Sequence, residues 1–187
     1  MTRLHWDMTL VSVHGEYPRA EDGFPAPGFG HPKDRRPDLK QARAGIAVSG
    51  DGGIPVFHRA FDGGAAEVSQ VIPVMKALQE LAAGRRLLIV GDSKLISYAN
   101  LAAMHAGGVT FVAPASKTYV PAAQLAGLSA DQATRVDYVA RCDQGKPADR
   151  RGTWHVTEDT MSVAGARKSD PVLTLRRVFV HSSARAA

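Results

Sequence analysis

The chain has 187 residues, of which 44% are hydrophobic and 22% are charged, a balance typical of a globular protein large enough to bury a core. No apolar run approaches the ~20 residues that cross a bilayer, and the N-terminus carries Asp7 where a signal peptide would be apolar. We therefore expect a cytoplasmic protein with no membrane partner. The single cysteine excludes an internal disulfide framework and a zinc cluster of thiolates.

The charge is basic, with a formal net value of +5 and a pI of about 9.6. An excess of Lys and Arg suits a polyanionic partner, because cations that contact phosphates release condensed counterions. Many basic proteins never contact nucleic acid, so charge alone is a weak indication of DNA or RNA binding.

The first third of the chain has the pattern of three strands. Residues 4–13 are β-prone and carry Asp7 in their middle. Residues 15–38 are rich in Gly and Pro and predict a loop, which is too long for a simple connector. Residues 42–50 and 54–61 flank an Asp-Gly-Gly turn, which predicts an antiparallel hairpin.

The next segments alternate between helix and strand. Apolar residues recur at three- and four-residue spacing over residues 68–81 and predict a helix. The wholly apolar run 87–90 predicts a central strand, buried on both faces, that leads to Asp92. A second helix is expected over about 98–106 and another buried strand over 109–113. The order strand, strand, strand, helix, strand, helix, strand predicts an α/β fold with helices packed on a mixed sheet.

The remainder of the chain has a weaker pattern. Residues 135–141, 153–156 and 173–181 are expected to be further strands, joined by polar turns.

Two aspartates occupy distinctive positions, Asp7 within the first strand and Asp92 at the carboxyl end of the fourth. Ligand sites in open α/β sheets lie outside the carboxyl ends of strands, so the two carboxylates meet if these strands are neighbours. Mg²⁺ prefers oxygen ligands and commonly takes one or two carboxylates with water and phosphate oxygens. The alternative is structural: Asp92 caps the following helix and Asp7 faces solvent.

Three motifs resemble bacterial insertion-sequence transposases of the DDE type. That family has a glycine-led basic loop ending in Arg-Pro-Asp-Leu before a strand and a hairpin turn. It also has a metal-binding Asp in an early strand followed closely by Thr, as in WDMT, and a second Asp closing a short apolar strand, as in LLIVGDSKLIS. The matching residues are Asp7, Thr9, Gly30, Lys33, Asp34, Arg36, Pro37, Asp38, Leu39, Gln41, Asp92, Ser93 and Lys94.

The resemblance implies a ribonuclease H-like core over residues 1–117 and a β-rich insertion segment over residues 118–187. It implies metal-dependent phosphodiester hydrolysis and strand transfer in DNA transposition, with two Mg²⁺ or Mn²⁺ ions held by Asp7 and Asp92. The expected partners are the DNA of transposon ends and targets, and a second copy of the chain in a homodimer on DNA. Four basic residues would hold DNA phosphates, unless they form an ordinary solvated surface: Lys33, Arg35, Arg36 and Lys94. Asp38 would orient a lysine or lie near the metals, unless it caps the next strand through local backbone hydrogen bonds.

One departure from the family concerns its third carboxylate, a Glu on a later helix. The sequence predicts no such helix, and Glu158 and Asp159 are expected to be surface residues in a strand-and-turn context. We therefore expect a chain truncated before the last catalytic helix, and its status as an enzyme stays open. The alternative is a catalytically inactive transposase remnant with residual non-specific DNA binding. A different nuclease of the same fold is a third reading, against which the Arg-Pro-Asp-Leu loop argues by resemblance.

Overall fold

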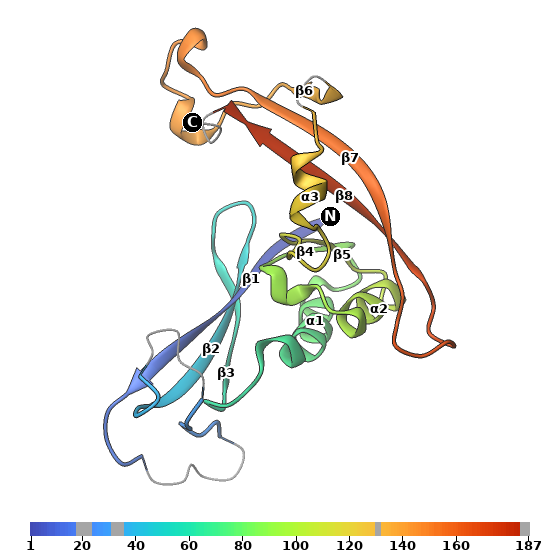
Figure 1. Cartoon of the computed structure of the whole chain (residues 1–187). Coiled ribbons are helices and arrows are strands. Elements are labelled where there is room, and N and C mark those ends of the chain that lie inside the picture. The colour runs from blue at the N-terminus through green and yellow to red at the C-terminus, as the bar shows by residue number, and fades with distance from the viewer. Residues whose placement is uncertain (18–23, 31–35, 130–131, 184–187) are drawn as a thin grey trace. The chain divides into compact units, whose positions relative to one another are not determined.

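The computed structural model describes residues 1–17, 24–30, 36–129 and 132–183. The chain divides into two compact units, Met1–Ala115 and Ser116–Ala187. The first unit contains a five-stranded mixed sheet with helices, and the second contains a three-stranded antiparallel sheet (Figure 1). The predicted mixed α/β class is confirmed at this level.

The sheet of the first unit has the strand order β3-β2-β1-β4-β5. Its strands are β1 (Thr2–Val13), β2 (Lys40–Ser49), β3 (Pro55–Phe61), β4 (Leu87–Val90) and β5 (Thr110–Val112). Strands β1, β2 and β3 are successively antiparallel, while β4 runs parallel to β1 and β5 parallel to β4. The predicted hairpin and the central position of the fourth strand are confirmed. The expectation of a buried fifth strand is wrong, because β5 lies at the sheet edge and Val112 is 56% exposed.

Strand β1 buries every second side chain, as a half-covered strand must. Leu4, Trp6 and Met8 are buried, whereas Asp7 between them is exposed. The indole of Trp6 lies so close to Gly45 on β2 that a Cβ at that position would overlap the ring. The ring of Trp6 also packs against that of Phe57 on β3, with centroids 6.1 Å apart. This packing fixes which face of β1 carries Asp7.

Helix α1 (Glu67–Ala82) covers the buried face of the sheet with the side chains of Val71, Val74, Met75, Leu78 and Ala82. The predicted helix is confirmed, but Val68 and Leu81, expected in its apolar stripe, are exposed. Each lies three residues from a buried residue of the stripe, and three residues turn a helix by about 300°, roughly 60° short of a full turn. Both side chains therefore lie at the margins of the stripe. The helix ends at Ala83, which has a left-handed φ of 49° and is followed by Gly84 at 78°.

Helix α2 (Tyr98–Ala106) has the predicted bounds and begins at Ser97, whose hydroxyl accepts a hydrogen bond from the backbone of Asn100. The Asn100 side chain is buried, and its Nδ2 donates to the carbonyls of Val68 at 3.1 Å and Lys94 at 3.4 Å. Asn100 therefore ties α2 both to α1 and to the short 3-10 helix η1 (Ser93–Leu95) that follows β4.

The sheet of the second unit has the order β6-β7-β8. Its strands are β6 (Thr134–Val136), β7 (Trp154–Val163) and β8 (Leu173–Ser182), and it also contains helix α3 (Ala122–Ala126) and the 3-10 helices η3 (Arg141–Asp143) and η4 (Ala148–Arg150). The predicted strand over 135–141 is wrong after residue 136, and the strand at 153–156 continues to 163. Polar residues occupy both faces of β7, so the sequence shows no clear period there.

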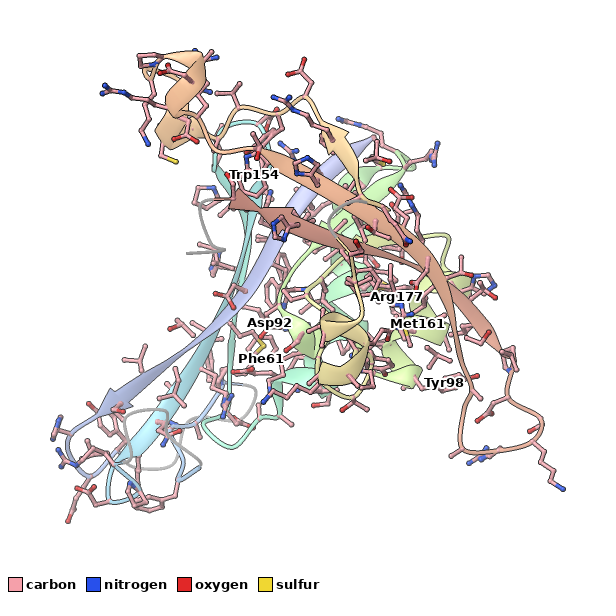
Figure 2. All side chains as sticks on the ribbon, turned by 45° about the horizontal axis from the view of Figure 1, so that its top comes forward. Phe61, Asp92, Tyr98, Trp154, Met161 and Arg177 are labelled. Atoms are coloured by element: carbon pink, nitrogen blue, oxygen red, sulfur yellow. The ribbon has the colours of Figure 1, made fainter. Side chains whose placement is uncertain are left out.

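Charged side chains connect the elements of this second unit. The buried carboxylate of Asp143 accepts hydrogen bonds from Lys146 Nζ at 2.7 Å and from the backbone N–H of Gly152 at 3.1 Å. Arg177 on β8 binds Asp159 on β7 through two nitrogens and donates to the Tyr119 carbonyl at 3.0 Å. The Arg177 side chain is labelled in Figure 2. Arg177 thus joins the hairpin to the segment that leads into α3.

Candidate functional site

Strands β1 and β4 bring Asp7 and Asp92 to the same level of the sheet. The parallel ladder between them ends with the pair His5–Val90, and Asp7 and Asp92 each lie two residues further along. Both aspartates line one pocket, which lies beside the middle of β1 and just beyond the carboxyl end of β4. The condition set by the sequence, that the first and fourth strands are neighbours, is therefore met.

Gly91 controls how closely the chain after β4 approaches β1. Its N–H donates to the Val112 carbonyl at 3.1 Å. A Cβ at this position would lie 2.8 Å from Leu95 Cδ1 and 3.2 Å from the Trp6 carbonyl oxygen. Only glycine allows this approach without displacement of a neighbour, and the approach places Asp92 beside the strand that carries Asp7.

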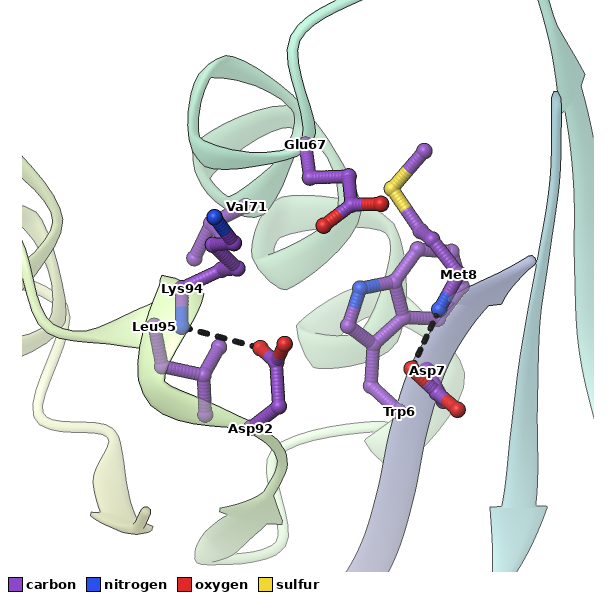
Figure 3. Close-up of a pocket in the computed structure, with 8 residues that line it drawn as sticks. All are labelled: Trp6, Asp7, Met8, Glu67, Val71, Asp92, Lys94 and Leu95. Carbon is purple, nitrogen blue, oxygen red and sulfur yellow. Dashed lines mark hydrogen bonds between the residues drawn. The ribbon is translucent and has the colours of Figure 1, made fainter. Parts of the chain in front are cut away.

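The pocket in Figure 3 is formed by residues of β1, the start of α1 and η1. Its lining residues are Trp6, Asp7, Met8, Glu67, Val71, Asp92, Lys94 and Leu95. Asp7, Asp92 and Lys94 are exposed, whereas Glu67 is largely buried. The apolar lining residues Trp6, Met8, Val71 and Leu95 belong to the core, so the pocket combines core side chains with charged ones.

One oxygen of each aspartate is held by a nearby backbone N–H. Asp7 Oδ1 accepts from Met8 at 2.8 Å, and Asp92 Oδ1 accepts from Lys94 at 2.9 Å. Asp92 therefore caps the short 3-10 helix η1, whereas the predicted helix α2 is capped by Ser97. The second oxygen of each carboxylate makes no hydrogen bond to a described residue, and both side chains are exposed. Capping consequently leaves each carboxylate with an oxygen for another partner.

Glu67 is a third acidic residue of the pocket, and the sequence analysis did not single it out for a function. It is the first residue of α1 and lies against Arg43 of β2, with 3.1 Å between Oε1 and the guanidinium. Arg43 also donates to the Gly63 carbonyl at 3.1 Å. The Glu67 carboxylate faces the same space as that of Asp92 (Figure 3). The helix dipole favours an acidic residue in the first turn of a helix. The position of Glu67 in the sequence is therefore explained by helix stability alone and gives no indication of a functional role.

The donor set suits a divalent cation that takes some of its ligands from elsewhere. Among the described residues, no group of three His, Cys, Asp or Glu side chains is arranged to hold a metal ion. Mg²⁺ and Mn²⁺ prefer oxygen donors, and Mg²⁺ is commonly bound by one or two carboxylates with water and substrate phosphates. Asp7 and Asp92 fit that mode, whereas the pocket does not form a closed metal cage.

The predicted basic residues are only partly described. Lys94 is exposed and lines the pocket, while Lys33 and Arg35 lie outside the described residues. Arg36 is exposed and binds Asp38 through Nε at 2.9 Å and NH2 at 2.7 Å. The hydrogen bonds from Arg36 lower the pKa of Asp38 to about 2. The main interaction of Asp38 is thus with an arginine two residues earlier rather than with a lysine.

Glu158 and Asp159 are engaged in ion pairs within the β7–β8 hairpin. Glu158 binds Arg176, and Asp159 binds Arg177, each through two nitrogens. These hydrogen bonds lower the pKa of both carboxyl groups. The two residues therefore have structural partners, in agreement with the surface role expected for them.

Comparisons with known proteins identify similar structures but no family. No protein-family profile matches the chain, and no curated protein matches it significantly. The Mos1 mariner paired end complex with Mn is similar with a TM-score of 0.41 and 13% identity, over 64% of this chain and 37% of that one. The Mos1 transposase paired-end complex with left transposon end gives a TM-score of 0.40 and 16% identity, over 64% and 36%.

A pre-cleavage Mos1 transpososome is similar to the same extent, with a TM-score of 0.40 and 14% identity over 64% of this chain. The matched region spans about 37% of the length of the Mos1 chains. Within the part of the chain that is described, no helix is both long and apolar enough to cross a membrane.

Proposed function

We propose that this chain carries the catalytic core of a DDE-type DNA transposase, with Asp7 and Asp92 as metal-binding carboxylates. The observation that carries the proposal is that both aspartates line one pocket, Asp7 from within β1 and Asp92 just after the end of the adjacent parallel strand β4. The order of strands and helices also agrees with the ribonuclease H-like fold that the sequence motifs imply.

The proposed substrate is DNA, at transposon ends and at targets. Divalent metal ions, two in this family, would supply activation of the attacking oxygen and stabilisation of the leaving oxygen of a phosphodiester. Asp7 and Asp92 would hold the ions through the oxygens that the backbone N–H groups leave available. Lys94, on the pocket rim, would contact a DNA phosphate and position the strand without reading its sequence.

The Arg43–Glu67 pair has a positioning role in this proposal. Both side chains are largely buried, with exposed fractions of 13% and 16%. The pair joins β2 to the start of α1 and so keeps a carboxylate at the pocket beside Asp92. Because Arg43 offsets the charge of Glu67, the pair acts through the position of these side chains and not through a net negative charge.

The test is metal-dependent nicking of supercoiled plasmid DNA by the full chain in Mg²⁺ or Mn²⁺. We expect nicking that is lost in Asp7→Asn and in Asp92→Asn and retained in Asp51→Asn, a matched control in the exposed β2–β3 turn. Circular dichroism should show that all variants are folded. Nicking that persists in both pocket variants contradicts the assignment.

The alternative function is non-specific DNA binding without catalysis. It is favoured by the absence, among the described residues, of a third acidic side chain placed to complete a metal group with Asp7 and Asp92. In that case the full chain binds DNA with an affinity that falls steeply with salt and shows no sequence preference, and it leaves the plasmid intact.

A further inference from the structure

We propose that the second unit contains a phosphate-binding site formed by Arg135, His155 and His181. The phosphate is either a free ion or part of a nucleic acid backbone. The proposal does not depend on metal chemistry at Asp7 and Asp92, because all three residues belong to the unit Ser116–Ala187.

The three side chains form one row across the three strands of the sheet. Arg135 on β6 pairs with His155 on β7, and His155 pairs with His181 on β8. Residues directly opposite each other on antiparallel strands project from the same face, with Cβ atoms about 4.5–5.5 Å apart. One guanidinium and two imidazoles therefore stand side by side, within reach of a single tetrahedral anion.

This row carries nitrogen donors without an acidic partner, unlike the rest of the hairpin. At the neighbouring positions Arg176 is paired with Glu158 and Arg177 with Asp159. Among the described residues, no carboxylate forms an ion pair with Arg135, His155 or His181, and none of the three makes a side-chain hydrogen bond. Their donors are free for a ligand, and their combined charge favours an anion over a metal cation.

Two members of the row line an open hollow in the same unit. His155 and His181 line it together with Thr157 and Phe179 from the next pair of the ladder and Leu125 of α3. The hollow measures about 590 Å³ including its open mouth. The Thr157 hydroxyl adds a donor beside the two imidazoles.

Phosphate matches this set of donors better than a carboxylate does. Arginine binds phosphate oxygens through two parallel N–H groups, and each imidazole can donate one further hydrogen bond. The charged groups on this face of the strands are Arg135 and the mutually paired Asp159 and Arg177. Asp137 follows β6 two residues after Arg135, and α3 carries no ionisable side chain.

The experiment follows the histidine ring signals of the full chain by NMR while inorganic phosphate is added in metal-free buffer. It uses the Asp7→Asn/Asp92→Asn background, so that a failed transposase assignment cannot affect the result. The signals are assigned with His155→Gln and His181→Gln. We expect both rings to shift and the other five histidines to stay in place.

Substitution should then weaken phosphate binding at each member of the row. A charge-assisted hydrogen bond corresponds to about tenfold in affinity, so Arg135→Gln, His155→Gln and His181→Gln should each weaken binding roughly tenfold. His105→Gln on α2 and Lys168→Gln in the β7–β8 turn are the matched controls and should bind as the parent does.

A second arm distinguishes the sources of phosphate. One outcome is that the rings shift with a single-stranded oligonucleotide at concentrations at which inorganic phosphate has no effect. That result identifies the backbone of a nucleic acid as the ligand. Equal effects per phosphate group identify a free anion. Unshifted rings with both ligands, or shifts that survive in the Arg135→Gln/His155→Gln/His181→Gln variant, overturn the proposal. So does a pair of rings that responds to Zn²⁺ and not to phosphate.

Discussion

The two units of this chain are stabilised by different kinds of contact. The first unit buries a continuous apolar layer beneath its sheet, in which Leu78, Ile89 and Leu101 are almost fully inaccessible. The second unit buries few large apolar side chains among its described residues, namely Val120, Val163 and Leu173. Its elements are joined instead by charge-assisted hydrogen bonds at Asp143 and Arg177. Burial of apolar area is insensitive to salt and acid, whereas ion pairs respond to both.

This difference has a counterpart in the two proposed sites. The pocket with Asp7 and Asp92 stands on a packed core, as a site requires when geometry must be held closely. The row of Arg135, His155 and His181 lies on a sheet with little apolar support, where binding of an anion would itself add stability.

The largest expected effect is on the core of the first unit. Leu78→Ala should lower the free energy of unfolding by about 2–5 kcal/mol, because the side chain is fully buried and its removal leaves a cavity. Urea denaturation followed by Trp6 fluorescence in a Trp154→Phe background measures the loss. Leu81→Ala, at a position that is 54% exposed on the same helix, is the control. Equal losses in the two variants would contradict the proposed packing of α1.

A smaller effect is expected at Asn100, which ties α2 to α1 and to η1. Asn100→Ala removes the hydrogen bonds from Nδ2 and leaves the Val68 carbonyl without this donor, at a cost of about 1–3 kcal/mol. Gln79→Ala is matched to it, since Gln79 also donates one amide hydrogen bond, but at the surface. Thermal unfolding monitored by circular dichroism compares the two. A larger decrease in Tm for Gln79→Ala would be inconsistent with the role assigned to Asn100.

Acid should distinguish the second unit from the first. Hydrogen bonds from Lys146, Arg176 and Arg177 lower the pKa values of Asp143, Glu158 and Asp159, respectively, in the folded chain. A lowered pKa contributes stability that is fully present above the unfolded-state value and is lost as the pH falls through the folded-state value. Stability of the second unit should therefore decline from about pH 5 downward.

Trp154, the tryptophan of the second unit, reports this decline. In a Trp6→Phe background, the fluorescence of Trp154 should follow the acid unfolding of the second unit. Asp143→Asn should make the dependence of stability on pH shallower, because the variant no longer gains a proton at position 143 when it unfolds. Asp51→Asn in the first unit should leave the profile unchanged. If Asp143→Asn has the same acid profile as the parent, the hydrogen bonds of Asp143 do not govern the acid response.

The smallest effects are expected among the arginines of the hairpin. The Arg176 and Glu158 side chains are 70% and 44% exposed, so Arg176→Gln should change stability very little. Arg177→Gln should be more damaging, because Arg177 is 14% exposed and also holds the Tyr119 carbonyl and Gln124. Hydrogen exchange measured by mass spectrometry over α3 compares the two variants. Faster exchange of α3 in Arg176→Gln than in Arg177→Gln would refute this order.

The sequence predicted the first unit well because its local patterns and its packing agree. Alternation in β1, the Asp-Gly-Gly turn and the three- and four-residue spacing in α1 each reflect burial on one side. The pattern did not reveal that β5 is an edge strand, since a strand as short as Thr110–Val112 is compatible with either position. In the second unit, ion pairs between β7 and β8 replace apolar burial, and charged residues give no period from which strand length can be predicted.

The candidate site was predictable in part for the same reason. Asp7 and Asp92 follow from strand positions, because the carboxyl end of β4 lies beside the middle of its parallel neighbour β1. Glu67 and its partner Arg43 are 24 residues apart in sequence and meet only through packing of α1 on the sheet. The register that aligns Arg135, His155 and His181 likewise depends on hairpin pairing, which dispersed histidines do not indicate.

The central claim, that Asp7 and Asp92 hold a divalent metal ion, is tested most directly by Mn²⁺ binding to the full chain, measured by electron paramagnetic resonance. We expect saturable binding. It should weaken at least about tenfold in both Asp7→Asn and Asp92→Asn, because each variant loses one charged ligand interaction, and it should be unchanged in Asp51→Asn. Unaltered Mn²⁺ binding in both pocket variants, with their folds intact, would contradict the central claim.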